Sequence, residues 1–135
     1  MKKYYVFALA ALAFSLVMTA CGSSAPTTSL RVDMTDFMYN PADVAVPAGE
    51  TITLELVNNG AVVHDFIIMN FGTQVGDAFG VEDEANMYWK TELGPGESET
   101  ITFVAPGEPG EYQIVCGVEG HYMAGMVGSL TVVSE

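Results

Sequence analysis

Basic residues are scarce in this chain. Its 135 residues include 4 Lys+Arg against 17 Asp+Glu, which gives a formal net charge of −13 at pH 7. Two of the four are Lys2 and Lys3, so the rest of the chain carries only Arg31 and Lys90. Nucleic acids and anionic lipid surfaces select Lys/Arg-rich faces, which excludes both as expected partners of this surface. A protein with a basic docking face fits the charge better, although an acidic surface also serves solubility alone.

Long hydrophobic runs are missing as well. The apolar run at residues 4–17 is short for a membrane span, which needs about 20 residues. Because it follows Lys2 and Lys3 and ends in small residues, it predicts a secretory signal over residues 1–20. The alternative to a cleaved signal is an uncleaved anchor.

The end of this run, Met18-Thr19-Ala20-Cys21, resembles the lipobox of bacterial lipoproteins, with Met18 where Leu is usual. That resemblance implies that Cys21 is lipidated and becomes the first mature residue. In an ordinary secretory cleavage, Cys21 would instead be a bystander. Residues 22–29 lack large apolar side chains and predict a flexible tether, so the expected organisation is a signal peptide (1–20), a lipidated cysteine with its tether (21–29) and one folded domain (30–135).

The folded part contains short alternating segments rather than long amphipathic helices. Apolar residues at every second position predict strands with one buried face. The clearest are Leu30-Val32-Met34, Ile52-Leu54-Leu56, Ile101-Phe103, Tyr112-Ile114-Cys116 and Leu130-Val132. Together with an apolar run over residues 62–69, they predict an all-β, Greek-key sandwich of about seven to eight strands. The Gly-rich, acidic segment 71–90 is expected to be a long connection with room for a short helix.

Cysteine and histidine are rare, which makes their positions informative. Cys116, His121 and Met126 follow one another at intervals of five residues in a Gly-rich stretch. Cys116 ends a predicted strand, so the returning loop should bring these three side chains to one end of the sandwich. His64, at the start of another predicted strand, is the remaining histidine. Two imidazoles, one thiolate and one thioether form the donor set of a blue-copper centre, which predicts one copper ion.

Each of these residues also has a structural interpretation. His64 can be a hydrogen-bonded core histidine, Cys116 a small buried hydrophobe and Met126 a core filler. A disulfide between Cys21 and Cys116 would leave no thiolate for a metal. The coincidence of all four donors in one ligand set favours the metal site.

Two segments carry a resemblance to a known family. They are Glu111-Tyr112-Gln113-Ile114-Val115-Cys116 and Gly120-His121-Tyr122-Met123-Ala124-Gly125-Met126-Val127-Gly128. These segments resemble the copper-binding end of the plastocyanin/azurin family of cupredoxins. Four residues between Cys and His, and four between His and Met, are most similar to auracyanins, and the resemblance extends over Leu30 to Val133.

One residue departs from that family pattern. Asp65 stands directly after the upstream histidine, where the family usually has Asn or Ser. An ionised carboxylate near the thiolate would favour Cu(II) and lower the reduction potential, whereas a protonated one would act more like Asn. The sequence leaves this effect open.

The expected protein is a small monomeric electron carrier on the extracytoplasmic face of a bacterial membrane, tethered through Cys21. Electrons are expected to pass through His121 and an apolar patch of Tyr122, Met123 and Ala124, where a redox protein such as a cytochrome docks. An enzyme would need a second metal site, and no histidine is left to build one. The alternative is a copper carrier of the cell envelope with methionines as exchangeable Cu(I) ligands. The candidates are Met34, Met38, Met69, Met87 and Met123.

Overall fold

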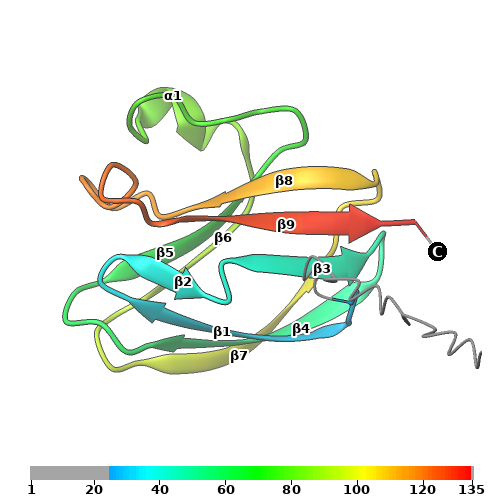
Figure 1. The fold of residues 1–135 in the computed structure, drawn as a ribbon, viewed down its shortest axis with the longest axis horizontal. Coiled ribbons are helices and arrows are strands. Elements are labelled where there is room, and N and C mark those ends of the chain that lie inside the picture. Colours follow the sequence, from blue (N-terminus) through cyan, green and yellow to red (C-terminus); the bar gives the residue numbers. More distant parts are fainter. Residues whose placement is uncertain (1–24, 135) are drawn as a thin grey trace, which may run out of the picture.

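Two β-sheets pack face to face in the computed structural model, which describes residues 25–134 (Figure 1). The predicted signal peptide and Cys21 therefore lie outside the described residues. The first sheet has the order β2 (Met38–Asn40), β1 (Ser29–Thr35), β4 (Thr51–Asn58) and β7 (Ser98–Val104). The second has the order β3 (Asp43–Pro47), β9 (Val127–Val133), β8 (Gly110–Val115), β5 (His64–Met69) and β6 (Met87–Leu93). The predicted all-β sandwich is confirmed.

The core lies between the two sheets and follows the predicted alternation. In β4, Ile52, Leu54 and Leu56 are fully buried, while the residues between them are exposed. In β1, Val32 and Met34 are buried in the same cluster. The period-two pattern therefore selected the inward faces correctly, because a strand points alternate side chains to opposite sides of its sheet.

The segment after β5 differs in one respect from its prediction. It contains a short helix, α1 (Val81–Glu84), as expected, but it ends before Met87, where β6 begins. Residues 87–90 are thus strand rather than connection. β6 is an edge strand whose alternate residues are only partly buried, so its apolar signal is weak. With the three-residue β2, it brings the number of strands within residues 25–134 to nine, against the seven to eight expected.

A second, smaller apolar cluster lies on the other side of the five-stranded sheet, where the long connection covers it. Its buried members are Ile67, Met69, Val75 and Val115. Val75 comes from the connection, and its backbone N–H donates to the Oε1 of Gln113 on β8 at 2.9 Å. The long connection is therefore packed onto the sheet rather than projecting from it.

Within residues 25–134, α1 is four residues long, and no helix has the length and apolar character needed to cross a membrane.

Several strand ends meet at one end of the sandwich, on the left in Figure 1. β5 begins where its antiparallel neighbour β8 ends, with Ile67 paired to Val115. β9 begins opposite the same residue, with Val127 paired to Val115. The β1–β2 turn reaches the same end, because β1 runs parallel to β4 and the residues after β4 lead directly into β5. This arrangement places three loops, β1–β2, β4–β5 and β8–β9, around one small volume.

Candidate metal centre

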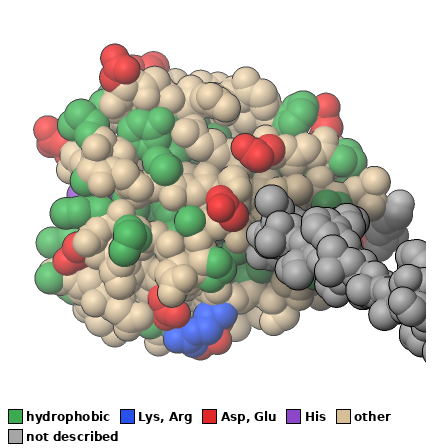
Figure 2. Space-filling model, in the orientation of Figure 1, with side chains coloured by type: hydrophobic (Ala, Val, Ile, Leu, Met, Phe, Trp, Pro, Cys, Tyr) green, Lys and Arg blue, Asp and Glu red, His purple; other side chains and the backbone are tan. Residues whose placement is uncertain are grey.

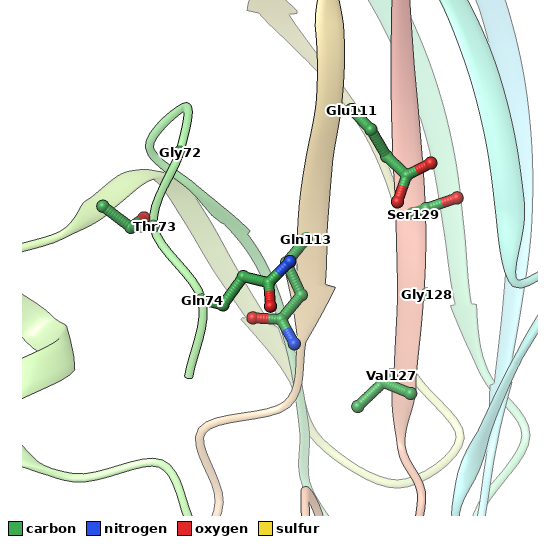
Figure 3. A pocket seen from close by; sticks show the side chains of 8 residues that line it. All are labelled: Gly72, Thr73, Gln74, Glu111, Gln113, Val127, Gly128 and Ser129. Atoms are coloured by element: carbon green, nitrogen blue, oxygen red, sulfur yellow. The ribbon is translucent and has the colours of Figure 1, made fainter. Parts of the chain in front are cut away.

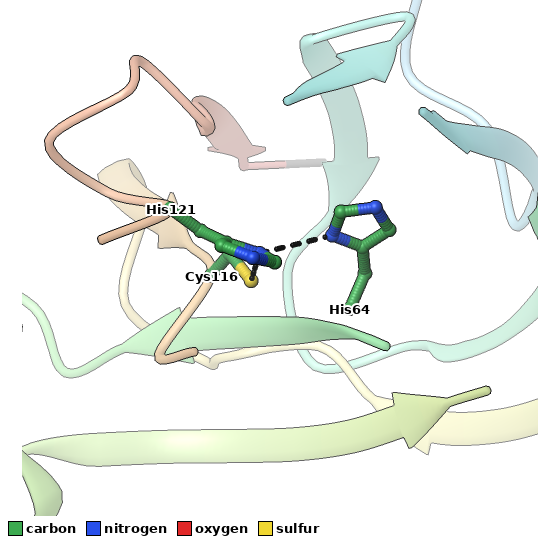
Figure 4. A group of neighbouring side chains, drawn as sticks. All are labelled: His64, Cys116 and His121. Carbon is green, nitrogen blue, oxygen red and sulfur yellow. Dashed lines mark hydrogen bonds between the residues drawn. The ribbon is translucent and has the colours of Figure 1, made fainter. Parts of the chain in front are cut away.

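Three donor side chains meet at this end of the sandwich. The donor atoms of His64, Cys116 and His121 all lie within 4.8 Å of one another, and all three residues are buried. His64 Nδ1 lies 3.2 Å from His121 Nδ1, which in turn lies 3.4 Å from Cys116 Sγ (Figure 4). The structure thus brings together the thiol and both imidazoles that the sequence proposed as ligands.

Two of the three lie at strand ends and the third lies in a loop. His64 is the first residue of β5, Cys116 directly follows β8, and His121 lies in the loop before β9. That loop is closed by its own backbone: the N–H of His121 donates to the Val118 carbonyl at 3.0 Å. Gly120 has φ 83°, a left-handed conformation that glycine adopts readily and that turns the chain back toward the sheet.

Met126 occupies the end of the same loop. It is fully buried, and its N–H donates to the carbonyl of His121 at 3.0 Å, while its own carbonyl accepts from the N–H of Cys116 at 3.3 Å. Its backbone is therefore hydrogen-bonded to two of the three clustered residues. Its role as an axial ligand stays a prediction.

Cys116 is buried, and within residues 25–134 its thiol is free. The backbone N–H of Asp65 donates to its Sγ at 3.3 Å. Burial raises the pKa of the Cys116 thiol, and backbone hydrogen bonds from Asp65 and Val118 only partly offset that effect. A cation bound to the sulfur would reverse this balance, because a metal stabilises the thiolate.

The two histidines have partners that sequence reasoning missed. His64 Nε2 lies 2.8 Å from Oδ1 of Asp36, a residue of the β1–β2 turn. The next residue, Phe37, packs edge-on against the His121 ring, with 4.7 Å between ring centroids. Burial lowers the pKa of His121, with a further contribution from the neighbouring His64. No spacing in the chain relates Asp36 to His64, since it is the pairing of β1 with β4 that brings the two together.

Asp65 is buried beside the cluster. Its backbone carbonyl accepts a hydrogen bond of 2.6 Å from the hydroxyl of Tyr39. Its Oδ1 lies 3.3 Å from Nζ of Lys90, an ion-pair contact that lacks the geometry of a hydrogen bond. The sequence singled out Asp65 but gave no indication of Lys90, which comes from the edge strand that it did not predict.

A model of the family described as "Cupredoxin-like domain" matches residues 8–132 of the chain. The chain belongs to the cupredoxin family. Auracyanin-B of Chloroflexus aurantiacus is 31% identical over 124 residues, covering 80% of this chain and 52% of that protein. This cupredoxin therefore spans about half the length of that curated relative.

Other comparisons agree with the family. The copper-resistant cuproprotein CopI of Rubrivivax gelatinosus is 30% identical over 112 residues, covering 77% of this cupredoxin and 66% of CopI. The structure of dithionite-reduced auracyanin from Roseiflexus castenholzii superposes with a TM-score of 0.70 and 33% identity, covering 81% of this cupredoxin and 99% of that chain. The predicted resemblance to cupredoxins, and among them to auracyanins, is confirmed.

The donor set of this cupredoxin fits copper. Two imidazoles and one thiolate, with a thioether close by in the chain, are the ligands typical of a blue-copper site. All three clustered donors are buried and already converge, so binding an ion would require little rearrangement of the strands. The predicted cofactor, one copper ion, agrees with both the family and this cluster.

The residues of the predicted electron port differ in their exposure to solvent. Met123 is 66% exposed and Ala124 is also exposed, and Figure 2 shows hydrophobic side chains gathered with a histidine at this end of the molecule. Tyr122 is only half exposed: its hydroxyl donates to the carbonyl of Val75 at 3.1 Å and accepts from Gln113 Nε2 at 3.3 Å. Tyr122 therefore joins the ligand loop to the long connection.

A groove of about 300 Å³ lies beside this junction and apart from the donor cluster. Figure 3 shows it between the start of the long connection and strands β8 and β9, with Gln74 and Gln113 on facing sides. Its lining is formed by Gly72, Thr73, Gln74, Glu111, Gln113, Val127, Gly128 and Ser129. It contains none of the clustered donors.

Proposed function

We propose that this cupredoxin carries single electrons between redox partners by cycling one copper ion between Cu(II) and Cu(I). The observation that carries the proposal is the buried convergence of His64, Cys116 and His121 on one point. When bound, copper supplies the one-electron couple. The protein contributes ligands fixed to strand ends, which limit rearrangement between the geometries that the two oxidation states prefer.

We assign the four ligand roles as follows. Cys116 would donate the thiolate, His64 and His121 would complete a trigonal plane, and Met126 would act as a weak axial ligand that tunes the reduction potential. The hydrogen bond from the Asp65 N–H to Cys116 Sγ supports this assignment, since it withdraws electron density from the sulfur and fixes its orientation.

The partners would be redox proteins that dock briefly at the exposed face of the ligand loop. Exposed Met123 and Ala124 offer a small apolar contact, and the acidic chain favours a basic partner such as a cytochrome.

We propose a monomer on the extracytoplasmic face of a bacterial membrane, tethered by a lipid on Cys21. It would not be an enzyme, because both histidines are used at one site and none remains for a substrate-binding copper.

A copper carrier of the cell envelope is the second candidate, favoured by the similarity to CopI, which is named a copper-resistant cuproprotein. Exchangeable Cu(I) ligands should be accessible. Met34 and Met69 are fully buried in apolar clusters, which leaves Met38 and Met123 as the clearly exposed methionines among residues 25–134. The burial of Met34 and Met69 counts against the carrier hypothesis, because neither side chain is accessible for exchange.

Optical spectra of the copper-loaded protein test the proposal. An electron carrier should be intensely blue or green as Cu(II), bleach with ascorbate and recover with an oxidant. A Cys116→Ser variant should lose that colour, because the absorption comes from the copper–thiolate bond. A colourless protein that binds Cu(I) alone and passes it to a chelator would support the carrier instead.

A further inference from the structure

The ring of His64 has a different partner on each of its two nitrogens. Nδ1 faces the donor cluster, 3.2 Å from Nδ1 of His121, and Nε2 lies 2.8 Å from Oδ1 of Asp36. Asp36 belongs to the β1–β2 turn, which supplies none of the proposed ligands. A third loop, besides the two that carry the ligands, thus contacts the centre.

We infer that Asp36 is a positioning residue of the metal centre, whose carboxylate holds the proton of His64 on Nε2 and so keeps Nδ1 free for the metal. A neutral imidazole carries a single N–H, and an ionised carboxylate can only accept. The 2.8 Å contact therefore selects the Nε2–H tautomer. The inference rests on the proposed copper site.

Burial gives this contact its weight. The His64 side chain has no exposed surface, so water cannot readily replace Asp36 as the acceptor for Nε2–H. A carboxylate that accepts from a metal-bound imidazole also raises the basicity of the nitrogen that faces the metal. Removing Asp36 would leave a buried donor unpaired and allow the other tautomer, in which Nδ1–H blocks the metal.

The β4–β5 turn holds the Asp36 carboxylate in this position. The backbone N–H of Ala61 lies 3.2 Å from Oδ1 and 3.0 Å from Oδ2 of Asp36. Asn58 accepts from the N–H of Gly60 at 2.8 Å, which fixes the turn that leads to His64. The Asp36 carboxylate is therefore held by a backbone N–H of the β4–β5 turn, independently of its contact with His64.

Gly60 leaves the space in which Asp36 and His64 meet. A Cβ on Gly60 would lie 2.3 Å from Asp36 Oδ1 and 2.7 Å from His64 Nε2, far closer than real Cβ contacts. Gly60 has no positive φ, so its backbone does not by itself demand glycine. The absence of a side chain there is therefore explained by the Asp36–His64 contact.

A purely structural role would produce the same geometry, since the bonds to Ala61 already join the two turns. The test must therefore report on His64 and on the metal. We would compare the wild type, Asp36→Ala, Asp36→Asn and the control Asp77→Asn, which removes the same charge from an exposed site in the long connection. Nitrogen-15 NMR of the copper-free and Cu(I) proteins gives the His64 tautomer, and competition with a chelator gives the Cu(II) affinity.

Asp36→Ala should weaken Cu(II) binding by about 10–100-fold, the range for residues that orient a metal ligand. In the same variant, the Nε2–H tautomer of His64 should no longer predominate. Asp36→Asn retains an acceptor oxygen and should keep the Nε2–H tautomer with a smaller loss of affinity. Asp77→Asn should match the wild type in both measurements.

Gly60→Ala provides an independent route to the same result. It should displace Asp36 from His64 and reproduce the affinity loss and tautomer change of Asp36→Ala, with Asp36 itself intact. Gly76→Ala is the matched control, because no atom lies within 4 Å of a Cβ placed there. Thermal unfolding of each copper-free variant would identify any change that reflects lost folding.

A folded Asp36→Ala protein with wild-type Cu(II) affinity and an unchanged His64 tautomer would overturn the inference. Failure of the proposed function has a different signature, because the wild type itself would then bind no copper with intense absorption. The tautomer of His64 in the copper-free protein would still decide whether Asp36 positions the ring.

Discussion

Nζ of Lys90 lies 3.3 Å from Oδ1 of Asp65, whose carboxylate is buried directly beside the donor cluster. The backbone N–H of the same Asp65 donates to Cys116 Sγ, so the residue that pairs with Lys90 also contacts the thiol. An ionised carboxylate alone would favour the more positive Cu(II) state, and the ammonium group of Lys90 opposes that effect. The pair therefore reduces the influence that Asp65 would otherwise have on the reduction potential.

Replacing Lys90 tests this relationship. Lys90→Met keeps the length and apolar stem but leaves the buried Asp65 carboxylate without its cation. The free energy of unfolding should fall by about 1–3 kcal/mol, at the lower end because the Lys90 side chain is 41% exposed. The reduction potential should fall by an amount on the order of tens of millivolts. Urea unfolding and voltammetry measure the two effects, and Lys90→Arg, which keeps the charge, should change both less. Equal potentials in all three proteins would contradict the compensation.

The stability of the copper-free protein should depend on pH in two directions. Burial lowers the pKa of His121 from 6.5, so below that pH the unfolded chain binds more protons and stability falls as the pH decreases. Burial raises the pKa of Cys116 from 9.0, so above that pH the folded protein binds more protons and stability falls as the pH rises. The free energy of unfolding should therefore be highest between about pH 6.5 and 9.

Urea unfolding at a series of pH values measures this profile. The matched variant is Cys116→Ser, in which the loss of stability that begins near pH 9 should disappear. Tyr39 and Tyr112 also have raised pKa values and add to the alkaline loss, but only from about pH 10, the ordinary value for tyrosine. If Cys116→Ser lost as much stability as the wild type between about pH 9 and 10, the titrating group would be one other than Cys116.

Local periodicity predicted most of the fold and the clustered donors. Strand alternation identified the buried faces, and Cys116 and His121 are close in the sequence, so one short loop sufficed to bring them together. His64 is remote in sequence, but its chemistry and its place at the start of a strand were enough to include it. What could be predicted is what depends on residue type and on short-range spacing.

The residues that support the ligands could not be predicted in this way. Asp36 and Phe37 contact the histidines only because β1 pairs in parallel with β4. The apolar pattern of neither strand indicates which strand it pairs with. Lys90 was assigned to a connection, since an edge strand with one half-buried face has a weak pattern. Such contacts depend on strand order, which is fixed by the packing of the whole chain.

Tyr122 connects the ligand loop to the long connection through its hydroxyl group. Tyr122→Phe removes the bond to the Val75 carbonyl and the bond from Gln113, while the ring remains packed in the smaller apolar cluster. The expected loss is about 1–2 kcal/mol in the free energy of unfolding, with faster amide exchange in residues 70–76. Tyr88→Phe is the control, because it removes a hydroxyl bond to Val104 on an exposed surface. Similar exchange in both variants would show that the bridge does not hold the connection.

Met126 is the proposed axial ligand, and a leucine there separates ligation from packing. Met126→Leu keeps a similar volume at a fully buried position, so folding should cost less than about 1.5 kcal/mol. The intense colour should persist, since the Cys116 thiolate remains, and the reduction potential should rise because Cu(II) loses a donor. Met69→Leu makes the same substitution at a fully buried site in the smaller apolar cluster. A potential that moves equally in both variants, or in neither, would show that Met126 does not tune the copper.

The exposed tip of the ligand loop is the proposed route for electrons, and Ala124 lies on it. Ala124→Lys adds a long cation where a basic partner would dock, so it should hold that partner away and slow bimolecular oxidation by a basic cytochrome by roughly tenfold or more. The optical spectrum and potential should stay unchanged, because the substitution is outside the buried donor cluster. Thr100→Lys adds the same charge at an exposed position of β7, in the other sheet, and should slow the reaction much less. Since the two variants have the same net charge, equal rates would mean that the cytochrome docks elsewhere, and a difference confined to Ala124→Lys would place the electron route at the loop.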